Sequence, residues 1–357
     1  MPTVTFNHDL LRRIQLNANI VHDSELWEDR LGLIGCSVEK CDDEIIEVEV
    51  FPDRPDLLSA ETMAFATRTF LHEQEAEPAL KVTSGDITMT VDPSLEQVRP
   101  IILGAVVRGV DTGHTDEARN EFIQGIMDHQ EKLHFALGRG RKRTSVGVHD
   151  LSKLHPPFRV VTVDSSYSFI PLAMENNMTI AEILTKHPKG VDYAHLLEGY
   201  EQFPVIIDAA GDVLSFPPII NGAHTTVTDS TTDFFIDVTG WDERACEATL
   251  LLVCLSLAVR GGAVESIELT GWDGMTVASP NGSPRTHCLP KPLLEDVLGR
   301  EFGDNEIAVA LNTMGGRMVR RRVVTDGPRV RDRWADAAVG EDEYLIEMPR
   351  WRSDILH

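Results

Sequence analysis

Hydrophobic positions in the first ninety residues change from a helical to an alternating spacing. Two segments carry apolar residues at the period of an amphipathic helix, 8–14 and 24–35. Three apolar residues then alternate with polar ones, as in a half-buried strand: Ile46, Val48 and Val50. Another helix is expected from residue 60, and two residues ahead of it can cap its N-terminus: Asp56 and Ser59. We therefore expect an N-terminal α+β domain over 1–90.

The pattern over 91–275 alternates apolar runs of strand length with amphipathic helices. Strands are expected over 99–110, 144–151, 158–164, 231–240 and 263–271. A hairpin is expected over 204–222, with its turn at Gly211 and Asp212. Helices are expected over 116–138, 179–203 and 241–262, the second of them broken by Pro188 and Gly190. These elements predict a second α+β domain, built on a mixed sheet.

The last stretch, 276–357, follows a turn-rich segment and contains no long apolar run. Two short helices are expected on either side of Gly303 and Asp304, followed by strands over 317–326 and 344–356. This order predicts a winged-helix-like domain. Its first expected strand carries a basic cluster, Arg317, Arg320, Arg321 and Arg322. No internal repeat is evident along the chain, so the fold class is α+β with three different domains.

The charge of the chain limits what it can bind. Asp and Glu number 57 against 33 Lys and Arg, which gives a net charge of -24. Such a surface repels polyanions except at local basic patches. One patch stands out in the loop after the expected helix 116–138: Arg139, Arg141, Lys142 and Arg143. These cations either form an anion site or only neutralise the end of the preceding helix and nearby acids.

Several classes of site have no support in the sequence. The five cysteines show no C-x-x-C spacing, so neither a zinc site nor a disulfide framework is indicated. No phosphate-binding loop, G-x-S-x-G elbow or H-E-x-x-H helix is present, so self-contained nucleotide chemistry is unsupported. The N-terminus lacks the apolar core of a signal peptide, and the longest apolar run, 250–259, is too short to span a bilayer. We expect a cytoplasmic protein without a membrane segment.

Polar residues on the expected strands of the second domain are the candidates for chemistry: Ser215, Asn221, His224, Asp237 and Thr239. Asp237 and Thr239 are two apart on a strand, so they share a face and together can bind an amine and orient a water. Alternatively, they cap the helix that begins near Asp242. His149 and Asp150 are interpreted as a hydrogen-bonded loop pair rather than a catalytic dyad.

Six segments, in their order and spacing, resemble the beta subunit of archaeal and eukaryal-type phenylalanyl-tRNA synthetase. They are 51–64 (FPDRPDLLSAETMA), 138–158 (GRGRKRTSVGVHDLSKLHPPF), 187–197 (HPKGVDYAHLL), 213–222 (VLSFPPIING), 234–240 (FFIDVTG) and 348–357 (MPRWRSDILH). In that family the beta subunit pairs with a catalytic alpha subunit in an alpha2beta2 tetramer, which joins phenylalanine to tRNA(Phe) using ATP and Mg2+. The middle domain of the beta subunit is an editing domain, which hydrolyses tyrosine attached to tRNA(Phe) by mistake.

The resemblance implies roles for individual residues. Ser215, Asp237 and Thr239 would line the editing site, with Asn221 beside them. Asp237 would bind the amino group or the tyrosyl hydroxyl, while the two hydroxyls fix the ester and a water acts as nucleophile. The basic loop, 139–143, would receive phosphates of the tRNA acceptor end. The chain departs from the family pattern at Gly222 and Trp241, which leaves the shape of the pocket open.

Asp354 corresponds to the first of several carboxylates proposed to hold magnesium in the family. The remaining carboxylates would lie beyond His357, so neither Mg2+ nor ATP is expected to bind tightly to this chain alone. The chain resembles the N-terminal portion of the subunit, without the C-terminal catalytic-like domain. Two alternatives remain: a free-standing hydrolase that edits mischarged tRNA in trans, and a non-catalytic scaffold that binds tRNA or partner subunits.

Overall fold

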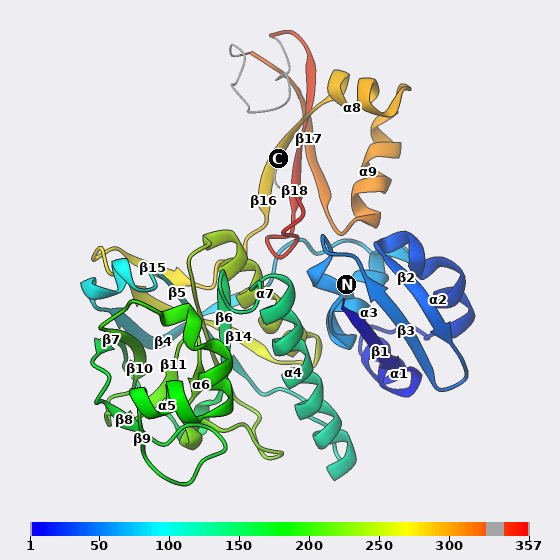
Figure 1. The fold of residues 1–357 in the computed structure, drawn as a ribbon. Coiled ribbons are helices and arrows are strands. Elements are labelled where there is room, and N and C mark those ends of the chain that lie inside the picture. Colours follow the sequence, from blue (N-terminus) through cyan, green and yellow to red (C-terminus); the bar gives the residue numbers. More distant parts are fainter. Residues whose placement is uncertain (1, 326–338, 356–357) are drawn as a thin grey trace.

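The computed structural model describes residues 2–325 and 339–355, which form three units (Figure 1). A small N-terminal unit and a large central unit lie side by side, and the last unit rises from between them as an arm. Helices and strands are both abundant, and the large sheet is mixed, so the predicted α+β class is confirmed. No helix in the described ranges is both long enough and apolar enough to cross a membrane.

The N-terminal unit is a three-stranded antiparallel sheet, order β1-β3-β2, covered by helices. Its elements are β1 (Thr3–Asn7), α1 (His8–Leu16), α2 (Ser24–Arg30), η1 (Leu31–Ile34), β2 (Cys36–Cys41) and β3 (Ile45–Val50). The predicted alternation is confirmed, because Ile46, Val48 and Val50 are fully buried. After η2 (Pro55–Leu57), α3 (Ala60–Phe70) begins with Ser59 as its cap, whose hydroxyl accepts from the Thr62 N–H.

The central unit is a ten-stranded sheet in which β14 pairs in parallel with β4, and β4 with β7. The sheet order is β12-β11-β10-β7-β4-β14-β5-β13-β6, with β15 paired to β14. Its strands are β4 (Val82–Val91), β5 (Ile101–Arg108), β6 (Thr144–Asp150), β7 (Phe158–Val163), β10 (Phe203–Ile207), β11 (Val213–Phe216), β12 (Ile220–Asn221), β13 (Phe234–Gly240), β14 (Ala263–Thr270) and β15 (Thr276–Ser279). The predicted hairpin is confirmed as β10 and β11.

Two long helices cover the central sheet, α4 (Asp116–Ala136) and α7 (Glu243–Val259). Nearly every residue of α7 is buried, because it packs on β5 and β13 and also contacts α3 of the first unit. The remaining elements are η3 (Pro93–Gln97), η4 (Leu151–Lys153), β8 (Ser168–Phe169), β9 (Met178–Thr179), α5 (Ile180–Lys186), α6 (Pro188–Tyr193), η5 (Ala194–Leu197) and η6 (Ala223–Thr225). The α7 helix thus joins the cores of the first two units.

The sheet pairing bears on where the units begin and end. Both β4 and β15 are strands of the central sheet, although the expected boundaries at residues 90 and 275 leave each of them in a neighbouring domain. We propose boundaries before Val82 and after Ser279, because the ladder hydrogen bonds of both strands are made inside this sheet.

In its described residues, the arm has two helices and a three-stranded antiparallel sheet, order β16-β18-β17. Its elements are β16 (Arg285–Pro290), α8 (Lys291–Leu298), α9 (Asp304–Thr313), β17 (Arg317–Val323) and β18 (Asp342–Met348). Both predicted helices are confirmed, β16 is an additional strand, and the last residue of each expected strand, 326 and 356, lies outside the described residues. Winged-helix-like remains our interpretation of this unit.

The basic cluster of β17 is paired with acids. Three of its arginines form ion pairs with carboxylates of β18 or α9: Arg317 with Glu347, Arg321 with Asp304 and Asp342, and Arg322 with Glu343.

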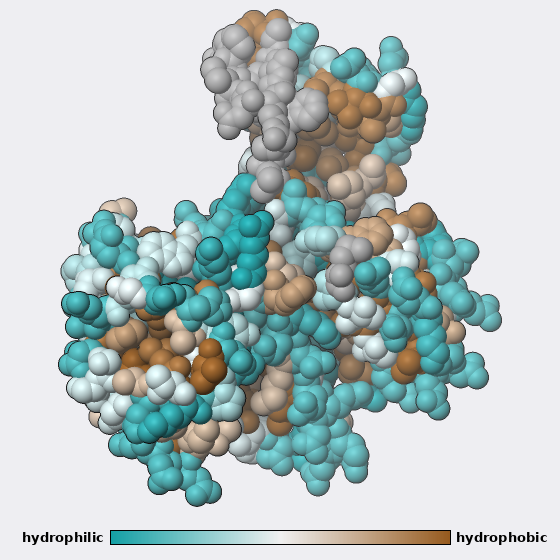
Figure 2. Space-filling view, in the orientation of Figure 1, coloured by the Kyte–Doolittle hydropathy of each residue, from teal (hydrophilic) through white to brown (hydrophobic). Residues whose placement is uncertain are grey.

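Figure 2 shows that the brown, hydrophobic surface of the arm lies beside α8 and α9. Exposed apolar side chains there include Val297, Leu298 and Val309. A surface of this kind is typical of a contact with another protein segment rather than with nucleic acid.

The first and last units repeat one arrangement, contrary to the expectation of no repeat. Each has the order strand, two helices, strand, strand, with the last strand in the centre of its sheet. Each is followed by an Arg-x-Asp pair in which the guanidinium holds both carboxylate oxygens, at 2.9 and 2.8 Å for Arg54–Asp56 and for Arg352–Asp354. In each pair the third guanidinium nitrogen, Nη1, donates to a backbone carbonyl oxygen just after the helices. The acceptor is Ile34 for Arg54 and Met314 for Arg352.

Candidate active site

A cavity of about 290 Å³ lies in the central unit beside the edge strand β6, between α4 and the β11–β12 segment. Side chains of α4 cover this edge, because Gln130 Nε2 donates to the Val146 carbonyl and the Val146 N–H donates to His134 Nε2. Most of the lining is apolar and includes Ile123, Ile126, Val148, Phe216 and Ile219. Polar side chains form two groups in this lining: a buried group around Asp237, which includes the half-buried Asn221, and a second group around the half-exposed Glu131.

The buried group contains three of the four predicted catalytic residues, Ser215, Asn221 and Asp237. Sheet pairing brings them together: Ser215 lies opposite Asn221 in the β11–β12 ladder, and Asp237 of β13 lies opposite Gly147 of β6. The side chain of Asp237 is only 3% exposed. These residues come from three strands, β11, β12 and β13, so only the folded sheet places them around one cavity.

Thr239, the fourth predicted residue, does not line the cavity. It is fully buried, and its hydroxyl lies 2.7 Å from Arg99 Nε and 3.1 Å from Ser145 Oγ. Arg99 is itself buried, and this burial lowers its pKa to about 10. Thr239 therefore holds a buried guanidinium in place beneath the site, and direct contact with an ester is not available to it.

His149, which the sequence interpretation left in a loop, belongs to the buried group. It lies on β6, fully buried, with Nε2 2.7 Å from Asp237 Oδ2 and Nδ1 2.9 Å from Thr225 Oγ1. The expected pairing of His149 with Asp150 is wrong, because adjacent residues of a strand face opposite sides. Asp150 instead accepts from Ser152 and Thr231. His149 could have been found from its spacing. It lies two residues after Gly147, the partner of Asp237 in the β13–β6 ladder, and residues two apart on a strand share a face.

Gly147 makes room for these polar groups. A Cβ atom at this position would lie 2.2 Å from Asp237 Oδ2, 2.7 Å from His149 Nε2 and 3.1 Å from Asn221 Oδ1. The first two distances are far below any van der Waals contact, so no other residue fits without displacing the carboxylate or the imidazole. The absence of a side chain on β6 is therefore what lets the three groups converge.

The alternative in which Asp237 and Thr239 cap the following helix is wrong. Asp242 caps α7, since its carboxylate accepts from the Ala245 N–H at 2.8 Å.

Of the two departures from the family pattern, Trp241 is half exposed and does not line the cavity. Gly222 adjoins it, and a Cβ there would lie 2.0 Å from the Val213 carbonyl oxygen, so the tight approach of β11 requires glycine.

The second polar group contains Glu131 and Lys189, which are half exposed, and His134 and Arg141, which are buried. Glu131 Oε1 lies 2.8 Å from Arg141 Nη2 and 3.2 Å from Lys189 Nζ, and its side chain is 49% exposed. The neighbouring His134 imidazole, followed by the charge of Arg141, lowers the pKa of Glu131 to about 2. Burial lowers the pKa of His134, so its imidazole is neutral and its Nε2 accepts from Val146. This group marks the solvent side of the cavity.

The structure divides the basic loop into inward and outward cations. Arg141 is buried, donates to the carbonyl oxygens of Pro218 and Ile219, and lies 4.3 Å from the Tyr193 ring centroid. Arg143 pairs with Asp242 at 2.6 Å. Arg139 and Lys142 are exposed, and neither forms an ion pair with any described residue. Arg141 thus anchors the loop to the cavity wall and Arg143 anchors it to the start of α7, while Arg139 and Lys142 face outward.

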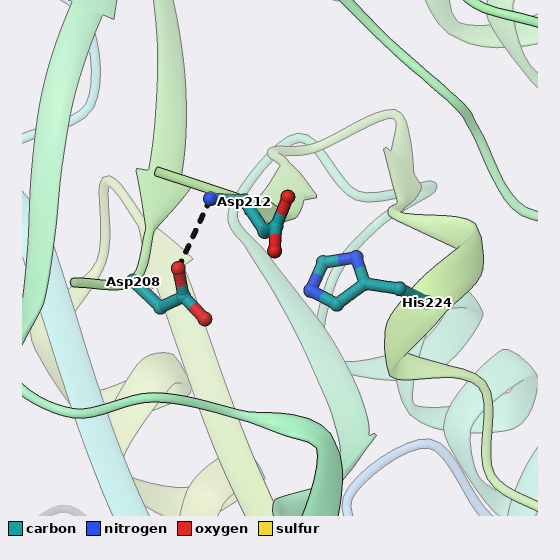
Figure 3. A group of neighbouring side chains, drawn as sticks. All are labelled: Asp208, Asp212 and His224. Carbon is teal, nitrogen blue, oxygen red and sulfur yellow. Dashed lines mark hydrogen bonds between the residues drawn. The ribbon is translucent and has the colours of Figure 1, made fainter. Parts of the chain in front are cut away.

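Two places carry carboxylates of the kind that bind cations. Both oxygens of Asp354 are held by Arg352, so Asp354 does not fit a magnesium site by itself. Asp208, Asp212 and His224 lie together at the β10–β11 turn, with His224 pointing toward the two carboxylates (Figure 3). However, Asp208 already accepts from four N–H groups, of Ala210, Asp212 and, twice, His155. These contacts explain Asp208 as the residue that shapes the turn, without an ion.

Comparisons with known proteins agree along the chain. The B3/4 domain model matches residues 99–253. A phenylalanine–tRNA ligase beta subunit from Methanosarcina barkeri is 38% identical over 100% of this chain and 60% of that protein, and one from Archaeoglobus fulgidus is 38% identical over 100% and 59%. The crystal structure of an N-terminal fragment of the phenylalanyl-tRNA synthetase beta subunit from Pyrococcus horikoshii covers 100% of this chain and 96% of that one, with a TM-score of 0.84 at 28% identity. The chain spans about 60% of the length of the curated relatives it matches.

Proposed function

The chain belongs to the family of phenylalanine–tRNA ligase beta subunits, and on that basis we propose that its central unit hydrolyses tyrosine wrongly esterified to tRNA(Phe). A ligase pocket built for phenylalanine rejects one added hydroxyl only by roughly 100-fold, so a second site is needed for accuracy. The observation that carries the proposal is the buried carboxylate of Asp237 in the wall of a mostly apolar cavity. Such a wall suits an aromatic ring that bears one polar group.

The two polar groups of the cavity orient this substrate. A tRNA is too large to enter the cavity, so the ester that joins it to the amino acid stays on the solvent side, beside Glu131 and the basic loop. The ring then points toward the buried group, where Asp237 accepts the hydrogen of the tyrosyl hydroxyl. Of the two roles expected for Asp237, this arrangement supports contact with the hydroxyl. Glu131, ionised and half exposed, is placed to receive the ammonium group.

Hydrolysis in this scheme rests on positioning. Holding the ester and a water in reacting geometry supplies a large share of a rate enhancement even without a dedicated base. Ser215 and Asn221 line the cavity and are the residues we assign to hydrogen bonds with the bound aminoacyl group. Thr239 acts below them, through Arg99 and Ser145.

We further propose that the complete enzyme joins phenylalanine to tRNA(Phe) with an alpha subunit, ATP and Mg2+, in an alpha2beta2 tetramer in the cytoplasm, where ribosomes use the product. The names of the relatives support ligation of phenylalanine to tRNA. Asp354 does not fit Mg2+ alone, and we assign no step to the metal in this chain. The apolar surface of the arm is our candidate for contact with other parts of the assembly.

The test is hydrolysis of tyrosyl-tRNA(Phe) and phenylalanyl-tRNA(Phe) by the 357-residue chain. We expect selective release of tyrosine, and at least ~10-fold less of it in Asp237→Ala, because the hydroxyl then loses its acceptor. Asp229→Ala, an exposed acid outside the cavity, is the matched control and should behave as the parent. Hydrolysis of tyrosyl-tRNA(Phe) formed by a separately added ligase would favour editing in trans. Binding of tRNA without any hydrolysis would replace our proposal with the non-catalytic scaffold.

A second prediction concerns the outward cations. Changing Arg139 and Lys142 together to alanine should weaken tRNA binding and lower the slope of log affinity against log salt by about 1.5, since two phosphate contacts are lost. The control is Arg12→Ala with Lys40→Ala, which removes the same charge from the exposed surface of the first unit. An equal salt slope in both double variants would mean that the loop touches no phosphate.

A further inference from the structure

We infer that His149, which does not line the cavity, sets the preference for a hydroxylated over a plain aromatic ring by fixing Asp237 as a hydrogen-bond acceptor. The inference rests on the proposed function of the cavity. His149 is thus a positioning residue, which acts on the substrate only through the Asp237 carboxylate.

The hydrogen bonds of His149 determine where its protons lie. Thr225 has one hydroxyl hydrogen and two acceptors within reach, His149 Nδ1 at 2.9 Å and the Gly222 carbonyl oxygen at 3.0 Å. When Thr225 donates to Nδ1, the single ring hydrogen of neutral His149 is on Nε2 and points at Asp237. When Thr225 donates to Gly222, Nδ1 carries a hydrogen for Thr225. The hydrogen that joins Nε2 to Asp237 Oδ2, 2.7 Å apart, is then a second hydrogen of this cluster, so the hydrogen bond is kept in this arrangement too.

In both arrangements a hydrogen lies between the two atoms, and we assign Nε2–H as its donor and Asp237 Oδ2 as its acceptor. Asp237 is therefore held as a carboxylate, and its other oxygen, which has no hydrogen-bond partner among the described residues, can only accept. Arg99, buried nearby without an acid within ion-pair distance in the described part of the chain, adds a positive charge close to this carboxylate. The buried group thus presents an acceptor and no donor at Asp237.

A group that can only accept a hydrogen bond favours the hydroxylated ring over the plain ring. A tyrosyl hydroxyl satisfies the free oxygen of Asp237, whereas a phenylalanyl ring covers it and leaves a buried carboxylate oxygen unpaired. Sites of this type reject the analogue without the hydroxyl far more strongly than an apolar pocket rejects an extra hydroxyl. Without the imidazole, Asp237 is free to rotate or to take up a proton and donate, and this discrimination is lost. His149 is packed against Phe235, 6.0 Å between ring centroids, so its own orientation is fixed.

The test compares His149→Leu with His149→Gln, whose side-chain amide can place an N–H near the position of Nε2. We expect His149→Leu to lower the ratio of kcat/KM for tyrosyl-tRNA(Phe) over phenylalanyl-tRNA(Phe) at least ~10-fold, and the glutamine variant to restore most of it. His195→Leu, a change of the same kind at an exposed position of η5, should keep the parental ratio. A ratio unchanged in His149→Leu, or an equal loss in the leucine and glutamine variants, would overturn the inference.

A binding measurement separates this inference from the proposed hydrolysis. Calorimetric titration with L-tyrosinamide and L-phenylalaninamide should show a preference for the tyrosine amide in the parent chain that His149→Leu loses. If the parent prefers the tyrosine amide but does not hydrolyse tyrosyl-tRNA(Phe), the proposed function fails and the role of His149 stands. If the parent has no preference between the amides, the inference itself is wrong.

Discussion

Gly147→Ala is expected to lower kcat/KM for tyrosyl-tRNA(Phe) hydrolysis at least ~100-fold, although the change adds a single methyl group. That methyl would lie 2.2 Å from Asp237 Oδ2 and 2.7 Å from His149 Nε2, so the carboxylate or the imidazole must move by about 1 Å. Displacements of that size in a catalytic site cost on the order of 100-fold in rate. The measurement is single-turnover hydrolysis, with circular dichroism to show that the variant is folded.

Gly125→Ala is the matched control for this change. Gly125 lies in α4, one wall of the same cavity, but a Cβ there meets no atom within 4 Å. Alanine is favoured over glycine inside a helix by about 1 kcal/mol, so this variant should be at least as stable as the parent and equally active. Full activity in Gly147→Ala would show that Asp237 and His149 do not form the working site.

The elements of the fold could largely be predicted from hydrophobic periodicity, because each periodic segment is long enough to distinguish a helix from a strand. The hairpin around Gly211 and Asp212 and the start of a helix near Asp242 depend on residues adjacent in sequence, and both were predicted. The repeat of the first and last units was missed. What the two units share is the sheet order and one Arg-x-Asp pair, and a three-residue motif is too short to stand out in the sequence.

The candidate site could be predicted only in part, for a physical reason. Ser215, Asn221 and Asp237 lie in segments that resemble a known family, and the cavity does bring them together. His149 was missed because its partner, Asp237, is 88 residues away, and strand pairing rather than local sequence sets their contact. Arg141 was misjudged for a similar reason. Its charge suggested a phosphate contact, but its guanidinium turns inward to carbonyl oxygens of the 218–219 segment.

These two cases indicate how the cavity obtains its polarity. The inward arginine anchors the loop at the solvent side, and the imidazole fixes the carboxylate at the buried side. Neither residue needs to touch the substrate to place its ring at the buried end of the cavity and its ester at the solvent end. The selectivity of the proposed site therefore depends on buried hydrogen bonds as much as on the groups that face the cavity.

The largest effect on stability is expected where α3 of the first unit meets α7 of the central unit. Arg260 Nε donates to Glu61 Oε1 at 2.6 Å, and the two side chains are 13% and 9% exposed. Burial by itself would raise the pKa of Glu61, but the charge and hydrogen bond of Arg260 outweigh it and hold the pKa below its usual value. This stabilisation is complete above about pH 4.3, the pKa of an unfolded glutamate, and is lost as pH falls through the folded-state pKa.

We expect Arg260→Leu and Glu61→Gln each to lower the free energy of unfolding by about 3 to 5 kcal/mol, because each leaves one buried charge without its partner. The double variant Glu61→Leu with Arg260→Leu should recover most of that loss, since the desolvation cost disappears with both charges. Urea unfolding at pH 7, followed by circular dichroism, measures all three. Lys186→Ala, which breaks the exposed pair with Glu182, should cost less than about 1 kcal/mol. If Arg260→Leu cost no more than Lys186→Ala, the contact between α3 and α7 would not depend on this ion pair, and the apolar residues that surround it would have to hold the two units together.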